Sequence, residues 1–323
     1  MAGRMAGRMA GCALIPFQCR PDRTGSGRHQ PGRDGLQQAG VASCAHLVMV
    51  YAARPGESIA RHDTGKEESM PRFRSLKTHL RALLASAEWE EHLDEIVALP
   101  GKGAVGPLLS SLLLGGEAKW RAVVALGRVV ARIADANMED ARIIMRRLMW
   151  HMNEESGNIG WGIPEAFGEI LACHPRLADE YHRILVSYVR ETGKDDNYCD
   201  HAPLRRGVYW AIGRLAQERP DLPGFVETAT PALLAGLADC DLPARGTAAW
   251  ALGVLATPAA LSALPTLGDL RTCDAPVEHF ERGRLLLCTV GELAQCAAQR
   301  IEAHCPPASG NAMPEADAKG TAA

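Results

Sequence analysis

The side chains best suited to chemistry lie in short loops between apolar helical segments, where cysteine, histidine and acidic residues recur. A Cys-Asp step, a nearby proline and then Arg-Gly occur three times there, beginning at Cys199, Cys240 and Cys273. Thiolate, imidazole and carboxylate groups are the usual protein ligands of zinc. Cys199 and His201, joined by Glu155 from the preceding loop, therefore form a hypothetical metal site.

Geometry limits this metal hypothesis and leaves a structural alternative open. Neighbouring helices pack about 8–10 Å apart, whereas two thiolates on one zinc ion must lie within about 4–5 Å, so the three loop cysteines cannot share one ion. Aspartate is favoured as a helix N-cap and proline in the first helical turn. In this structural interpretation, the arginine that follows bridges to a carboxylate of the preceding repeat. It leaves the cysteines and the acidic density unexplained.

An internal repeat positions these loops. Five segments share the order small residue, apolar residue, glycine, variable residue, aliphatic residue, and their glycines are 41, 45, 40 and 38 residues apart. Glycine inside a helix costs about 1 kcal/mol relative to alanine, so five in register indicate that a neighbouring helix approaches closely. An amphipathic helix precedes each one, and a two-helix unit with this period predicts an α-solenoid. The glycines are Gly127, Gly168, Gly213, Gly253 and Gly291.

Two of the units resemble HEAT repeats of the short bacterial type that also occurs in phycobilisome-lyase HEAT-like proteins. One pairs the segment at Pro107 with the run from Trp120 to Gly127, and the other pairs Pro231-Ala-Leu-Leu with the run from Arg245 to Gly253. The resemblance implies an all-α fold, an α-solenoid of about five paired-helix HEAT-like repeats over residues 98–300, with an N-terminal capping helix pair at 72–98. The same scaffold serves many unrelated functions.

The second helices of such repeats line the concave face, which makes their tryptophans candidates for recognition. Trp210 and Trp250 each precede a repeat glycine by three residues and form a stacked ladder, either in the core or in a groove; both alternatives stay open. Arg205→Glu or Trp161→Ala is expected to weaken partner binding and leave helicity intact. The candidate partner-binding residues are Glu154, Glu155, Trp161, Glu165, Asp195, Asp196, Tyr198, His201, Arg205, Arg206, Trp210 and Trp250.

The ends of the chain differ from the repeats in composition. Residues 1–69 carry a net charge of +3 and only three leucines, so they bury too little apolar surface to order. We expect 1–69 to be a disordered extension, with translation starting at Met70. The solenoid is expected over 70–303 and a disordered tail over 304–323. Cys288 and Cys296 are expected to be buried thiols of one apolar helix.

Charge and motifs exclude several function classes. Residues 70–323 carry a net charge of −6, which argues against nucleic acid binding, and no apolar run is long enough to cross a membrane. Ten cysteines without paired short spacings favour a reduced, cytoplasmic setting. HEAT-type enzymes include bilin lyases, DNA glycosylases and a hydroxylase that uses His-Glu pairs, and no His-Glu dipeptide occurs here.

We therefore expect a scaffold or adaptor that needs no cofactor and binds a protein or peptide in the concave face. Whether the chain has an enzymatic activity is left undecided, with the balance against it. The alternative is a HEAT-type enzyme or assembly factor, lyase-like or metal-dependent, that uses the acidic Cys/His edge of repeats 2–4.

Overall fold

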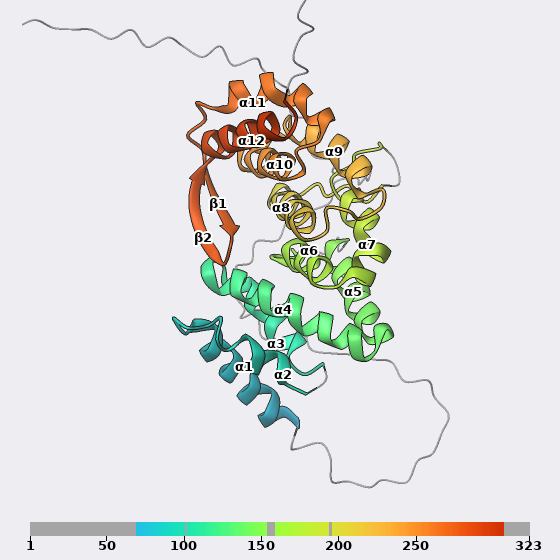
Figure 1. Cartoon of the computed structure of the whole chain (residues 1–323). Helices are drawn as coiled ribbons and strands as arrows, with labels where there is room; N and C mark the ends of the chain where they lie inside the picture. Colours follow the sequence, from blue (N-terminus) through green and yellow to red (C-terminus); the bar gives the residue numbers. More distant parts are fainter. Residues whose placement is uncertain (1–68, 101, 154–158, 194–195, 307–323) are drawn as a thin grey trace, which may run out of the picture. The chain divides into compact units, whose positions relative to one another are not determined.

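The computed structural model describes residues 69–100, 102–153, 159–193 and 196–306, all within one compact unit, Thr64–Ala323 (Figure 1). The expected extension and the possible start at Met70 concern residues 1–69, most of which lie outside the described residues. Most of the expected tail, from residue 307 onward, also lies outside them.

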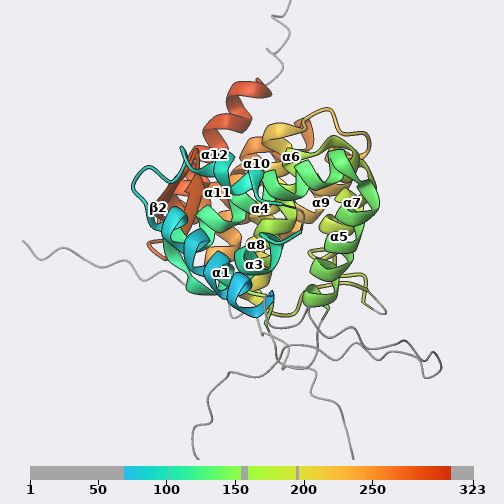
Figure 2. The ribbon, with the colours of Figure 1, turned by 90° about the horizontal axis from the view of Figure 1, so that it is seen from below.

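The helices form two rows, as the repeat predicts. An inner row consists of α4 (Gly116–Ala136), α6 (Ile163–Cys173), α8 (Ala202–Glu218), α10 (Leu242–Leu255) and α12 (Val290–His304), each packed against the next. An outer row consists of α3 (Val105–Ser111) with η1 (Leu112–Leu114), α5 (Met138–Met152), α7 (Pro175–Ser187), α9 (Phe225–Gly236), and η2 (Pro258–Ala263) with α11 (Leu264–Leu270). The first helices are α1 (Ser69–Ala85) and α2 (Leu93–Ala98). Figure 2 shows the two rows side by side. The predicted all-α solenoid is confirmed.

The repeat glycines lie where adjacent helices approach most closely. A Cβ at Gly168 would overlap the Cβ and backbone of Ala211 on α8, and one at Gly253 would lie 2.6 Å from the Cα of Ala297 on α12. At Gly213 the missing side chain leaves room for the ring of Trp250. Only a residue without a Cβ lets the inner helices approach this closely.

Local signals fix where some helices begin. Asp241 is the N-cap of α10 and accepts a hydrogen bond from the backbone N–H of Ala244, with Pro243 in the first turn. Thr289 and Glu292 form a capping box at the start of α12. The predicted Asp-x-Pro start therefore holds for α10. It does not hold for α8, whose N-cap is His201 and has no side-chain capping bond.

The fifth repeat departs from the prediction, because a β-hairpin separates its two helices. Strands β1 (Pro276–Glu281) and β2 (Arg284–Thr289) pair antiparallel around the two-residue turn Arg282-Gly283. Both turn residues have positive φ angles, 52° and 77°, which a type I′ turn requires. Cys288 therefore lies in β2 and not in a helix, and Cys296 is exposed on α12, so the prediction of two buried thiols on one helix is wrong.

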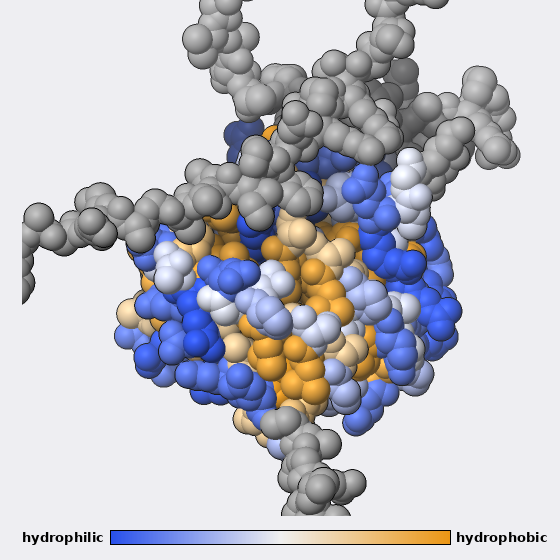
Figure 3. Space-filling view, turned by 90° about the horizontal axis from the view of Figure 1, so that it is seen from above, coloured by the Kyte–Doolittle hydropathy of each residue, from blue (hydrophilic) through white to orange (hydrophobic). Residues whose placement is uncertain are grey.

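The last repeat forms one end of the helix rows, since no helix follows α12 up to residue 306. Leu261 of η2 and Leu264 of α11 are only partly buried against the core. Figure 3 looks onto this end and shows apolar surface between polar residues. None of the helices that the structure describes is both long and apolar enough to span a membrane.

Gly168→Ala is expected to destabilise the fold by about 1–3 kcal/mol, because the added methyl group must displace α8 from α6. Gly268→Ala is the matched control: nothing lies within 4 Å of a Cβ at this helical position, so alanine should be neutral or slightly stabilising. Urea denaturation of both variants measures the difference, and equal effects would contradict the close-approach explanation.

Candidate functional site

The hairpin covers the centre of the inner-helix face, where the sequence predicts a binding groove. The indole Nε1 of Trp210 donates a hydrogen bond to the carbonyl of Phe280 on β1, at 2.8 Å. The ring of Trp250 lies edge-on to that of His279, with centroids 4.5 Å apart. Both tryptophans are only 3% exposed. Of the two alternatives for this pair, both rings take the core position, and Trp210 contributes only to the inner lining of the two cavities beside the hairpin.

An aromatic cluster holds the hairpin in place. Phe280 stacks on Trp120 of α4, with centroids 4.9 Å apart and planes 5° from parallel, and Trp210 lies 4.7 Å from Trp120. The tip reaches the segment between α1 and α2, where a Cβ at Gly283 would lie 2.6 Å from a carboxylate oxygen of Glu90. One hairpin thus connects the last repeat with the first helices.

In the described part of the chain, two of the cavities lie beside the hairpin. The tip-side cavity, about 760 Å³, lies along the C-terminal halves of α4, α6 and α8 and includes Glu169, Cys173, Arg214 and Phe280. The loop-side cavity, about 600 Å³, lies at the N-terminal ends of α4, α6, α8 and α10. Its lining includes Leu113, Lys119, Trp161, Glu165, Arg206, Pro243, Val277 and Leu287.

The loop-side cavity combines exposed apolar residues with paired charges. Leu113, Trp161 and Leu287 are 66%, 45% and 77% exposed and come from three separate segments of the chain. Lys119 and Glu165 form an ion pair of 2.7 Å on its floor. This cavity can therefore accept an apolar group without leaving Lys119 or Glu165 unpaired.

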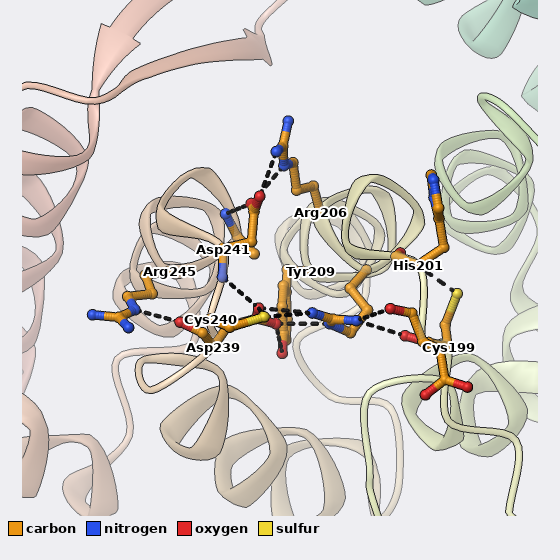
Figure 4. A network of polar contacts seen from close by, with 11 residues as sticks. Cys199, His201, Arg206, Tyr209, Asp239, Cys240, Asp241 and Arg245 are labelled. Carbon is orange, nitrogen blue, oxygen red and sulfur yellow. Dashed lines mark hydrogen bonds and ion pairs between the residues drawn. The ribbon is translucent and has the colours of Figure 1, made fainter. Parts of the chain in front are cut away.

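A second charged network ties repeat 3 to repeat 4 (Figure 4). Arg205 donates two hydrogen bonds of 2.8 Å to the carboxylate of Asp239 and two more to the carbonyls of Cys199 and Asp200. Burial alone would raise the pKa of Asp239, but the bonds from Arg205 and from the backbone N–H of Asp241 outweigh it and lower that pKa. Asp239 belongs to the repeat that follows Arg205, so the predicted bridge to the preceding repeat has the opposite direction.

This network corrects what is expected of Arg205. Its side chain is 4% exposed and fully engaged, so Arg205→Glu would bring a carboxylate against Asp239 inside the protein. Arg205→Glu is therefore expected to destabilise the fold and lower helicity, contrary to the prediction from the sequence. Arg206, which pairs with Asp241, remains partly exposed and lines the loop-side cavity.

In the described part of the Cys/His edge, Cys199 and His201 make contacts within the protein. Cys199 is buried, burial raises the pKa of its thiol, and its Sγ lies 3.9 Å from the carbonyl of His201. The ring of His201 lies edge-on to Trp161, 5.4 Å between centroids. The described residues contain no group of three His, Cys, Asp or Glu side chains placed to hold a metal ion. Glu155 lies outside the described residues, so the metal site stays a prediction.

Of the other predicted residues of this edge, two lie outside the described residues and two make contacts within the protein. Glu154 and Asp195 lie outside the described residues. The carboxylate of Asp196 accepts hydrogen bonds from the backbone N–H groups of Thr192, Gly193 and Tyr198, which closes its own loop and lowers its pKa. Tyr198 packs under the guanidinium of Arg205, 5.4 Å from the ring centroid. These contacts give Asp196 and Tyr198 structural roles.

Several lining residues of the loop-side cavity, among them Leu113, Lys119 and Leu287, are absent from the set predicted from the sequence. Two of them lie in Leu-Leu-Leu runs, Leu112–Leu114 and Leu285–Leu287, which are followed by turn or strand ends and not by a continuing helix. For Leu113 the available signal was an apolar run that continues past the end of α3, whereas Leu287 lies in strand β2 and had no such signal.

Arg205→Ala is expected to lower the free energy of unfolding by about 3–5 kcal/mol, because it leaves Asp239 buried without its cation. Arg206→Ala removes a partly exposed pair with the same geometry and should cost about 1 kcal/mol or less. Urea denaturation compares the two variants. Equal losses would contradict the structural role assigned to Arg205.

Stability is also expected to depend on His279. Burial lowers the pKa of this imidazole to about 4, with Glu281 opposing the shift and Arg300 adding to it. The neutral ring therefore favours the folded state above pH 6.5, and this contribution, up to about 3 kcal/mol, is lost as the pH falls from 6.5 towards 4. His279→Gln should flatten the fall in unfolding free energy over that range. An unchanged pH profile would contradict the assignment.

A match to a protein family agrees with the repeat architecture. The model of the HEAT-like repeat family matches residues 202–253, which span α8 to α10. The chain is similar to a designed armadillo repeat protein, with a TM-score of 0.43 and 17% identity over 73% of this chain and 95% of that one. It is also similar to computationally designed armadillo repeat proteins for modular peptide recognition, with a TM-score of 0.41 and 17% identity over 73% of this chain and 94% of that one. No curated protein matches the sequence. The family match over residues 202–253 and the observed helix rows together support HEAT-like repeats in this chain.

Proposed function

We propose that the chain is a non-catalytic interaction scaffold that binds a protein or peptide partner at the loop-side cavity. One observation supports this most strongly: Leu113, Trp161 and Leu287 are large, exposed apolar residues, and all three line the same cavity. Exposed apolar residues that converge on a concave site are typical of protein interfaces. Helical solenoids commonly present such extended surfaces to partners.

The geometry defines how the partner would bind. Trp161 stands at the rim, and tryptophan is among the residues that contribute most to interface energies. Lys119 already pairs with Glu165, and Arg206 with Asp241, so an incoming group meets no unpaired charge from these four residues. The partner therefore contributes an apolar anchor, and the affinity should depend more on buried area than on salt.

The proposed binding surface lies to one side of the inner-helix face and not at its centre, where the sequence predicted it. The hairpin fills the centre through Trp210 and Trp250, whereas the loop-side cavity is lined by Trp161, Glu165, Arg206 and the buried Trp210 of the predicted set. The phycobilisome-lyase type and the cytoplasmic setting stay predictions.

Trp161→Ala is expected to weaken partner binding by at least about tenfold, because the apolar anchor loses its contact at the rim. Trp150→Ala is the matched control, since Trp150 is exposed on α5 and does not line the cavity. A photo-crosslinking amino acid in place of Leu113 identifies the partner, and isothermal titration then measures its affinity for each variant.

Circular dichroism should show equal helicity in the wild type and both tryptophan variants. Equal affinities of the wild type and Trp161→Ala would refute the site, and an equal loss in Trp150→Ala would place the partner on a different surface.

A further inference from the structure

Strand β2 has one free hydrogen-bonding edge. The two-residue turn makes Glu281 and Arg284 a hydrogen-bonded pair, and such pairs alternate along an antiparallel ladder. His279 with Leu286 and Val277 with Cys288 are then the next bonded pairs. The bond from the N–H of Val290 to the carbonyl of Ala275, at 3.0 Å, continues the same alternation. Leu285 and Leu287 therefore direct their backbone N–H and C=O groups away from β1.

The two edges of the hairpin have different surroundings. On β1, the carbonyl of Phe280 accepts a bond from Trp210, and the strand packs against α10. On β2, no backbone partner for Leu285 or Leu287 is present in the described part of the chain. Leu286 and Leu287 are 43% and 77% exposed. Figure 1 shows β2 as the outer strand of the hairpin, and β2 contacts α4 and α12.

The free edge lacks the features by which proteins usually protect such edges. Exposed edge strands commonly carry a lysine, a proline or a bulge that blocks pairing with another chain. Between Arg284 and Glu292, β2 and the start of α12 carry no charge and no proline, and the ladder from Pro276 to Thr289 is regular. A leucine-rich edge of this kind favours pairing with another strand.

We propose that β2 pairs with β2 of a second copy of this chain, antiparallel and about a two-fold axis at Leu286. Leu285 of each copy then exchanges both backbone bonds with Leu287 of the partner subunit. The two hairpins become one four-stranded sheet. Every outward N–H and C=O group of Leu285 and Leu287 is satisfied, and the exposed Leu286 side chains meet at the axis.

Self-complementarity makes a second copy the occupant that fits best. Two-fold pairing brings leucine against leucine at the centre, and Arg284 lies opposite Cys288 of the partner subunit, so no like charges meet. The opposite edge of the hairpin is already covered by α8 and α10. Pairing therefore closes at two copies and does not propagate into a fibre. This inference does not depend on the proposed partner.

The proposed register predicts how a charge at position 286 changes the stability of the dimer. In Leu286→Lys, two lysines face each other across the non-hydrogen-bonded pair, and the dimer dissociation constant should rise at least about tenfold. Leu286→Glu should weaken the dimer in the same way. An equimolar mixture of the two variants should recover a heterodimer. Ile143→Lys is the control, because Ile143 is equally exposed but lies on α5.

Sedimentation velocity of the full chain under reducing conditions measures the assembly, and far-UV circular dichroism confirms that each variant folds. We expect a wild-type dimer that Ile143→Lys retains and either Leu286 variant loses. Hydrogen exchange of the wild type gives an independent reading: the amides of Leu285 and Leu287 should become protected as concentration rises. A monomer at all concentrations, a dimer that survives in Leu286→Lys, or unprotected amides at Leu285 and Leu287 would overturn the proposal.

Discussion

The close approach of successive inner helices is the constraint on which the rest of the structure depends. A Cβ at Gly168 would overlap Ala211, and a Cβ at Gly213 would overlap the ring of Trp250. These contacts set the spacing between repeats, and this spacing brings Asp239 within reach of Arg205 and Glu165 within reach of Lys119. The loop-side cavity lies at the ends of the same helices, so its shape follows from the same contacts.

The hairpin determines which part of the inner face remains available. Phe280 and His279 pack on Trp120 and Trp250, so the centre of a surface that many solenoids leave open is filled by the chain itself. A partner then meets Trp161 at one side. The hairpin is also the element that carries the free edge of β2, so one insertion accounts for both the restricted cavity and the proposed dimer contact.

The helix rows could be predicted from the sequence because the repeat glycines recur with a regular period inside helical patterns. In such a repeat each unit packs only against its neighbours, so the period alone defines the architecture. The sequence did not predict the hairpin, because β1 and β2 have only six residues each, show no regular apolar–polar alternation and lie among longer helical patterns. The burial of Trp210 and Trp250 depends on that hairpin and could not be predicted from their spacing. The direction of the Arg205 bridge likewise depends on helix offset, which residue types do not specify.

The most direct test of this account is the rate of hydrogen exchange at the amides of Val277 and His279, which the hairpin ladder pairs with β2. If the hairpin is seated on the inner helices, these amides exchange as slowly as those in the middle of α8, through unfolding of the whole unit. If they exchange much faster than α8, the hairpin opens independently. The inner-helix face would then be accessible, which contradicts the restriction of binding to the loop-side cavity.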